Sequence, residues 1–194
     1  MVNGLHTDET VAMGIPFIPA RIMFGSDTMR YSAAKTVTCP FTGQKLLALP
    51  ALSPDLAVIH VHRCDKYGNA QIDGISVSDA DLARASKKVI ITTEEIVPEE
   101  VIRQDPARTI IPAFCVDAVV EVKYGSYPGN MPYAYFSDEE HLREWLSADS
   151  KPETLEPFLR KYIFGTKDFS EYLELCGGEA KMERLRRIEF LEEV

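Results

Sequence analysis

The residue pattern that most directly suggests chemistry is a pair of histidines, His60 and His62, with one residue between them. They lie in the β-prone run AVIHVH at 57–62, and side chains two apart in a strand point to the same face of its sheet. Cys64 is next in that row and Asp65 follows it, so the group contains residue types that bind transition metals. No second cluster of ligands accompanies them. We therefore expect no metal site, and the histidines are then satisfied inside the sheet or at its C-terminal edge.

A second candidate is the segment DKYGN at 65–69, which contains Gly68 and Asn69 and directly follows this apolar run. In open α/β sheets, ligands collect beyond the carboxyl ends of the strands, so a turn at this point is well placed to bind one. Glycine and asparagine also tolerate positive φ and are common turn residues. The sequence therefore predicts a turn here, and it leaves open whether the turn binds a ligand.

Other candidates carry charge or a hydroxyl group. Arg21 follows the rigid apolar segment PFIPA, where it could bind a substrate carboxylate with two hydrogen bonds or hold a loop against the sheet. Thr42 and Gly43 lie in PFTGQK at 40–45, which lacks the spacing of a phosphate-binding P-loop. Glu94 and Glu95 follow an apolar strand. Burial there would raise the pKa of a carboxylate and suit it to acid–base chemistry, whereas a structural ion pair would hold that pKa low.

Strands and short helices alternate in the part of the chain that holds these residues. Further strands are predicted at 89–93, 109–112 and 118–122. One helix is predicted at 78–88, with Ser78 as its N-cap, and a second helix from Pro98 to Arg103. This succession predicts an α/β fold: an open sheet covered by helices on both faces.

From residue 137 the pattern becomes helical. Ser137 precedes three acidic residues and is predicted to cap the first of three or four helices. The last helix, predicted at 179–193, carries an apolar stripe that would pack on its own domain: Met182, Leu185, Ile188 and Leu191. We therefore predict an α/β core at 1–136 and a C-terminal helical extension at 137–194 that packs on it.

The composition excludes several classes of protein. The chain has 194 residues with a net charge of −9, a sign that disfavours nucleic-acid binding. It has no apolar run long enough to span a membrane and no secretory leader pattern, so we expect that the protein is neither inserted in a membrane nor secreted. The four cysteines are dispersed without a C-x-x-C pair, as in reduced cytosolic proteins. A cytoplasmic location is therefore expected.

The GxSxG and GxGxxG motifs of hydrolases and dinucleotide-binding proteins are also absent.

The order of several segments resembles the A (α) subunit of class I coenzyme A transferases, closest to the glutaconate CoA-transferase group. Each segment is weak alone, and their ordered succession over residues 11–146 is specific. The matching segments are GIPFIPAR at 14–21, GSD at 25–27, PFTGQKLLALPAL at 40–52, PDLAVIHVHRCDKYGNAQ at 54–71, VIITTEEIV at 89–97 and RTIIPAFCVDAVVEVKYGSYPG at 108–129.

This resemblance implies a reaction and a partner. Such enzymes move CoA from an acyl-CoA to a short mono- or dicarboxylic acid, and the CoA thioester is a substrate rather than a tightly bound cofactor. A glutamate attacks the thioester, and CoA then passes through a glutamyl-CoA thioester. In this group the glutamate lies in a Ser-Glu-Asn-Gly segment of a B-type subunit. That segment is absent here, so we identify no catalytic residue in this chain and expect a hetero-oligomer.

The resemblance also implies roles for the candidate residues. Arg21 would bind the substrate carboxylate, and Thr42 and Gly43 would line the acyl pocket. Gly68 and Asn69 would approach the thioester, and His60 is a further candidate for lining the substrate site. The remaining two candidates, Glu94 and Glu95, would support the subunit contact or the residues that line the site.

Two differences from the family qualify this expectation. Family members usually carry about 100 further residues ahead of the point where this sequence begins, so a shortened gene product, a fragment and a split subunit are all compatible with it. A missing edge would leave sheet hydrogen bonds and apolar surface to be covered, which predicts dependence on a partner. Relatives on the same fold also include a CoA-thioester hydrolase and a decarboxylase. These two activities and a non-catalytic partner subunit remain the alternatives.

Overall fold

The computed structural model describes residues 14–192 and divides into two compact units, Met1–Glu121 and Val122–Val194. Within the described residues, no helix is long and apolar enough to cross a lipid bilayer. The domain limits at residues 136 and 137 remain a prediction.

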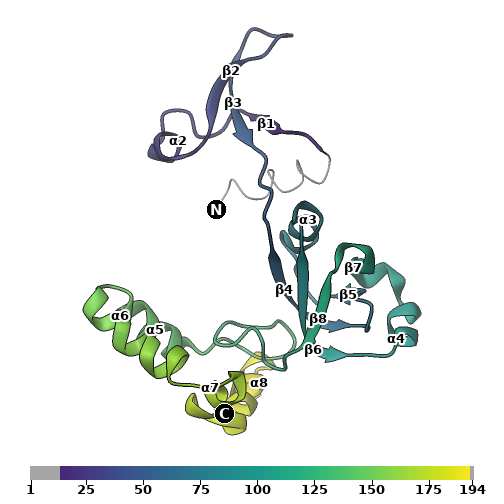
Figure 1. Cartoon of the computed structure of the whole chain (residues 1–194), viewed down its shortest axis with the longest axis vertical. Coiled ribbons are helices and arrows are strands. Elements are labelled where there is room, and N and C mark those ends of the chain that lie inside the picture. Colours follow the sequence, from purple (N-terminus) through teal and green to yellow (C-terminus); the bar gives the residue numbers. More distant parts are fainter. Residues whose placement is uncertain (1–13, 193–194) are drawn as a thin grey trace. The chain divides into compact units, whose positions relative to one another are not determined.

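The first unit begins with a small antiparallel sheet of three strands in the order β1-β3-β2 (Figure 1). Its elements are β1 (Phe17–Ala20), α2 (Asp27–Tyr31), β2 (Lys35–Thr38) and β3 (Lys45–Pro50). β3 pairs with both neighbours, and its alternate residues Leu47 and Leu49 are buried. This alternation is the expected pattern of a strand with one buried face.

The second sheet has five strands in the order β7-β5-β4-β6-β8 (Figure 1). The strands are β4 (Ala57–Cys64), β5 (Ala70–Gln71), β6 (Val89–Ile96), β7 (Thr109–Ile111) and β8 (Ala118–Glu121). β4, β6 and β8 are parallel, whereas β5 is antiparallel to both of its neighbours. The connections contain α3 (Asp79–Ala85), α4 (Glu99–Gln104) and two 3-10 turns, η1 (Pro106–Arg108) and η2 (Ala113–Cys115). The predicted open α/β sheet is confirmed.

The core of this sheet lies on one of its faces. The odd-numbered residues Ala57, Ile59 and Val61 of β4 are buried there, and α3 contributes Ala83 to the same cluster. The even-numbered Val58 lies on the opposite face and is 59% exposed. The predicted helix starting after Ser78 is present, although the Ser78 hydroxyl makes no capping hydrogen bond.

The second unit is helical, as predicted. It contains α5 (Glu139–Ala148), α6 (Pro152–Leu159), the π-helix η3 (Arg160–Phe164), α7 (Phe169–Leu175) and α8 (Gly178–Glu189). The capping prediction was wrong by one residue: the Asp138 carboxylate, not Ser137, accepts a hydrogen bond from the His141 amide at 3.3 Å. A carboxylate at this position is also favoured by the helix dipole.

The core of the helical unit combines α8 with residues that precede α5. Met182 and Leu185 of the predicted stripe pack with Tyr127, Met131 and Tyr135, and the partly buried Ile188 lies against them. Leu191 was wrongly included in that stripe. α8 ends at Glu189, and Leu191 adopts a positive φ of 55° and is 93% exposed.

Candidate functional site

One polar group on the five-stranded sheet joins residues from two neighbouring strands. His60 of β4 and Thr92 of β6 occupy paired positions, with 2.9 Å between His60 Nδ1 and Thr92 Oγ1. His60 Nε2 lies 2.8 Å from Oε1 of Glu94, and both side chains are mostly buried. A carboxylate only accepts hydrogen bonds, so Nε2 carries a proton, and the Thr92 hydroxyl can pair with Nδ1 because a hydroxyl both donates and accepts. Both ring nitrogens are therefore engaged, and His60 positions Glu94.

The second histidine has a structural role. His62 is buried, and its Nδ1 accepts a hydrogen bond of 2.9 Å from the Asp73 amide. Cys64 is fully buried in the apolar core, and this burial raises the pKa of its thiol to about 11. Between residues 14 and 192, no group of three histidine, cysteine or acidic side chains could hold a metal ion.

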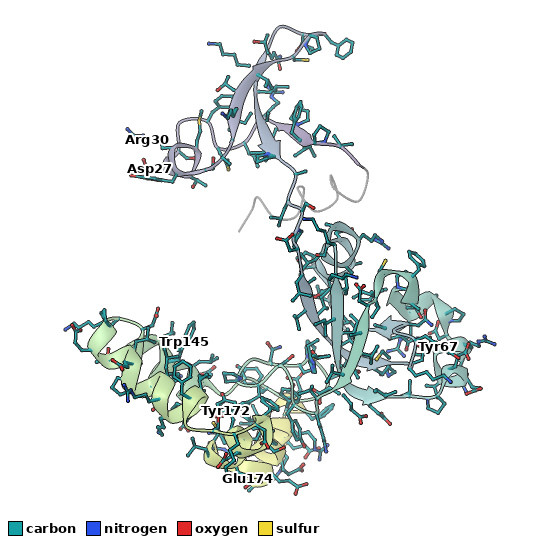
Figure 2. The ribbon with its side chains drawn as sticks, viewed as in Figure 1. Asp27, Arg30, Tyr67, Trp145, Tyr172 and Glu174 are labelled. Atoms are coloured by element: carbon teal, nitrogen blue, oxygen red, sulfur yellow. The ribbon has the colours of Figure 1, made fainter. Side chains whose placement is uncertain are left out.

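The predicted turn after β4 is present and is organised by Asp65, which is fully buried. Asp65 Oδ1 accepts hydrogen bonds from the amides of Tyr67 and Asn69 at 2.9 and 3.0 Å. Asp65 Oδ2 accepts a third from Asn69 Nδ2 at 2.7 Å. One carboxylate thus fixes the whole turn, and the Tyr67 side chain extends outward from it (Figure 2).

Contacts distant in sequence hold the same turn in place. Asn69 Oδ1 accepts a hydrogen bond of 3.0 Å from the Ala113 amide in η2. Gly68 has a φ of +96°, and a Cβ added there would lie 2.7 Å from Cγ1 of Val116. Both the backbone conformation and the close approach therefore require glycine. Gly68 and Asn69 form a rigid feature beyond the carboxyl end of β4.

Three candidates lie in the three-stranded sheet. Arg21 is exposed immediately after β1, and the structure shows no ion pair for it among the described residues. Thr42 and Gly43 lie in the exposed β2–β3 turn, which is closed by a 2.9 Å hydrogen bond from the Gly43 amide to the Cys39 carbonyl. The Thr42 hydroxyl, helped by backbone amides, lowers the pKa of the Cys39 thiol.

The two glutamates of β6 differ in their surroundings. Glu94 faces His60, as described above, whereas Glu95 is exposed and its amide lies 3.3 Å from the Thr93 hydroxyl. The structure thus brings His60 together with Glu94, and Gly68 together with Asn69.

The sequence interpretation missed an ionic cluster behind the β4–β5 turn. Asp73 is paired with the guanidinium groups of Arg63 and Arg108. Partial burial opposes ionisation of Asp73, but these cations and His62 outweigh it and hold the pKa of the carboxyl below its usual value. The adjacent polar residues His62 and Arg63, at the end of an apolar strand, were a signal for a polar cluster. Its partners could not be identified without the fold.

The helical unit has an aromatic pocket of about 360 Å³. Figure 2 labels two of its lining residues, Trp145 and Tyr172. Among the side chains that line it are His141, Trp145, Phe158, Tyr162 and Tyr172. His141 Nε2 lies 3.1 Å from the Tyr172 hydroxyl, and burial lowers the pKa of His141. His141 is therefore a hydrogen-bonding member of a mainly aromatic and aliphatic wall.

Sequence comparison identifies the family. The pattern of the coenzyme A transferase family matches residues 4–122, which is more than half of the chain. The chain belongs to the coenzyme A transferase family. The A-type subunit of glutaconate CoA-transferase from Acidaminococcus fermentans is 33% identical over 187 residues, which cover 88% of this chain and 58% of that protein. A protein of Archaeoglobus fulgidus is 54% identical over 185 residues, which cover 95% of this chain and 41% of the relative.

Solved structures of coenzyme A transferases and related enzymes agree with this assignment. The glutaconate CoA-transferase of A. fermentans superposes with a TM-score of 0.87 and 31% identity, over 93% of this chain and 62% of the other. The decarboxylase AibA/AibB superposes with a TM-score of 0.65 and 32% identity, over 80% and 58% respectively. The chain therefore spans less than two thirds of the relatives it matches.

Proposed function

We propose that this chain forms part of the A-type subunit of a CoA-transferase that moves CoA from an acyl-CoA to a short mono- or dicarboxylic acid. The observation that carries the proposal is the superposition on glutaconate CoA-transferase over 93% of the chain. The nucleophilic glutamate is supplied by a B-type partner, because the Ser-Glu-Asn-Gly segment expected around it is absent from this sequence.

The proposed reaction proceeds by covalent exchange. The partner's glutamate carboxylate attacks the thioester carbonyl, which forms a mixed anhydride and releases CoA thiolate. The thiolate then attacks the glutamyl carbonyl of the anhydride, so that a glutamyl-CoA thioester forms and the first acid leaves. The second acid enters by the reverse of these two steps. CoA is conserved and no water is consumed.

The proposed roles in this chain are binding and positioning. Arg21 is exposed and carries a guanidinium that can bind a carboxylate with two parallel hydrogen bonds. Thr42 and Gly43 would line the acyl group, and the turn at Gly68 and Asn69 would contact the thioester. His60 would hold the carboxylate of Glu94 in one orientation.

An exchange assay on the assembled enzyme tests this proposal. The complex is incubated with acetyl-CoA and each of a panel of short carboxylic acids, and acyl-CoA, free CoA and CO₂ are measured together. The proposal expects a new acyl-CoA that forms one for one with acetate, without accumulation of free CoA. A glutamate-to-glutamine change in the partner's Ser-Glu-Asn-Gly segment should abolish the exchange.

A decarboxylase is the second candidate, because the AibA/AibB structure is as similar in sequence as the transferase structure. Release of CO₂ from a CoA-linked acid, without transfer to a second acid, would favour it. Net release of free CoA would indicate a thioester hydrolase. A complex without any of these activities would favour a non-catalytic role.

A further inference from the structure

The aromatic pocket of the helical unit has the size and the walls of a site for a small organic molecule. Its volume of about 360 Å³ is roughly twice that of an engineered cavity of about 150 Å³ that binds benzene. A pocket of this volume has room for two fused rings. Much of its wall is aromatic, and the rings that line it include Trp145, Phe158, Tyr162 and Tyr172. Ring surfaces of this kind favour contact with a flat aromatic ligand.

The wall of the pocket is held in place by its own side chains. The ring centroids of His141 and Tyr162 lie 4.5 Å apart with an interplanar angle of 89°, and those of Phe158 and Tyr162 lie 4.7 Å apart. Tyr162 belongs to the π-helix η3, a rare conformation that is frequent at functional sites. At Gly165, which follows η3, an added Cβ would lie 2.5 Å from the Arg160 carbonyl oxygen, so glycine is needed there. A wall that is already ordered lowers the entropic cost of binding.

His141 provides the pocket with an accessible hydrogen-bonding atom. The residue is only 8% exposed, and its Nε2 lies 3.1 Å from the Tyr172 hydroxyl. Its Nδ1 has no hydrogen-bond partner between residues 14 and 192. Among the described residues, Thr109 Oγ1 is the one fully enclosed side-chain nitrogen or oxygen without a partner, so His141 Nδ1 is not fully enclosed. The cavity that His141 lines is the aromatic pocket, and Nδ1 is therefore available to a ligand there.

The tyrosine hydroxyls of the wall are already paired. The Tyr162 hydroxyl donates to Glu144 Oε2 at 2.8 Å and accepts from Lys161 Nζ at 2.6 Å. The Tyr172 hydroxyl is engaged with His141, and burial lowers the pKa of His141, which opposes a positive charge in this wall. A charged ligand would lose its hydration here without gaining a free ionic partner. The wall therefore matches an uncharged ligand with one polar group.

We propose that the aromatic pocket of the helical unit binds an uncharged bicyclic aromatic molecule whose single hydrogen-bonding group pairs with His141 Nδ1. Because the Tyr172 hydroxyl can donate or accept, Nδ1 is an acceptor in one tautomer of the ring and a donor in the other. Indole only donates, through its N–H, and quinoline only accepts, through its ring nitrogen. The inference rests on the helical unit alone, so it can hold in a complex that lacks CoA-transferase activity.

Isothermal titration calorimetry with indole and with quinoline tests the pocket. The full chain is titrated as it is recovered from its own cells, with any partner bound. We expect saturable binding, with one probe bound about tenfold more tightly than the other, because a net hydrogen bond contributes about that factor. Equal affinities, or no saturable binding, would overturn the proposal. Binding to the isolated chain but not to its complex would show that another chain fills the pocket, which would also overturn it.

Two neighbouring residues of η3 provide a matched pair of variants that localises the binding. Ile163 lines the pocket and is 53% exposed, whereas Phe164 is 75% exposed and is not part of the lining. Ile163→Glu should weaken binding of the preferred probe about tenfold or more, since it places a carboxylate against apolar ligand surface. Phe164→Glu should leave the affinity unchanged. Equal affinities in the two variants would place the bound probe elsewhere and overturn the proposal.

His141→Phe tests the hydrogen bond to Nδ1. Phenylalanine keeps an aromatic ring but has no ring nitrogen, so the variant should bind indole and quinoline with similar affinity. A preference that persists in this variant would show that His141 does not contact the polar group of the ligand.

Trp145→Ala is the second variant, because His141 is buried and its replacement can disturb folding, whereas Trp145 is 42% exposed. It should weaken binding of both probes about tenfold and keep the preference between them, since it removes ring surface and leaves His141 in place. Unchanged affinities in Trp145→Ala would overturn the proposal.

Discussion

Gly68 gives the sharpest test of how the β4–β5 turn is built. Its φ of +96° is unfavourable for any other residue, and an added Cβ would lie 2.7 Å from Cγ1 and 2.8 Å from Cβ of Val116. Gly43 offers a matched comparison, because its φ of +68° is also positive but nothing lies within 4 Å of an added Cβ. Alanine at Gly43 therefore measures the backbone cost alone, and alanine at Gly68 adds a steric cost.

The two costs can be estimated from general values. A non-glycine residue in the left-handed region costs about 1–2 kcal/mol, and overpacking a tight site adds about 1–3 kcal/mol. On these values we expect Gly43→Ala to destabilise its sheet by about 1 kcal/mol and Gly68→Ala by about 3 kcal/mol. Replacing Val116 by alanine as well should recover most of the steric part of the Gly68→Ala cost.

Hydrogen exchange is the appropriate assay for this comparison. The only tryptophan, Trp145, lies in the helical unit, so its fluorescence does not report on the sheet. The free energy of opening is measured from peptides that cover β4 and β5 for Gly68→Ala, and β2 and β3 for Gly43→Ala. The reasoning is refuted if Gly68→Ala costs no more than Gly43→Ala, or if Val116→Ala fails to reduce the cost of Gly68→Ala.

Three further predictions concern charge and reactivity. Asp138→Asn should lower the free energy of unfolding of the helical unit by about 2 kcal/mol at neutral pH, since Asp138 is buried and paired with a lysine at 2.9 Å. The pKa of Asp138 is lowered in the folded state, because its hydrogen bonds outweigh burial, so this contribution is present above the unfolded pKa. The stabilisation is lost as pH falls through the folded pKa of Asp138, so the free energies of unfolding of variant and wild type, measured by urea titration, should converge in acid. A difference that stays constant with pH would contradict this. Iodoacetamide near neutral pH should modify the partly exposed Cys39, whose thiol pKa is lowered, well before the buried Cys64, whose thiol pKa is raised. Mass spectrometry follows the reaction, and the reverse order would contradict the structure. Arg21→Ala should raise the KM for the acid about tenfold while assembly is unchanged. The control Arg30→Ala, at an exposed arginine paired with an aspartate, should leave this KM unchanged. An unchanged KM for Arg21→Ala would show that Arg21 does not bind the acid.

Local structure was predictable where the sequence carries a local signal. The apolar runs at 57–62 and 89–93 predicted β4 and β6, and the turn residues at 65–69 predicted the turn between β4 and β5. A run of apolar and β-branched residues followed by glycine and asparagine favours one local conformation whatever lies around it. The helices of the second unit were predictable for the same reason.

The candidate site was only partly predictable, because its contacts join residues that are distant in sequence. His60 and Glu94 are 34 residues apart and meet only because β4 and β6 pair in one particular register. The close approach of Val116 to Gly68 likewise depends on where η2 packs. Sequence spacing identifies such residues as candidates, but the register of parallel strands decides which of them touch.

The exposed face of the sheet shows another limit of sequence analysis. An apolar strand such as β4 predicts burial on both sides, yet Val58 is exposed among the described residues. The sequence pattern predicts a strand that is covered on both faces, and it does not identify the covering residues. This is why the pattern predicts dependence on a partner and does not identify it.

Native mass spectrometry of the tagged chain, recovered from its own cells, tests the central claim most directly. The proposed function predicts a stoichiometric complex in which a B-type subunit is present, with a glutamate in its Ser-Glu-Asn-Gly segment. Recovery of the chain as a lone monomer, or only as copies of itself, would contradict the claim that it forms part of a two-subunit CoA-transferase.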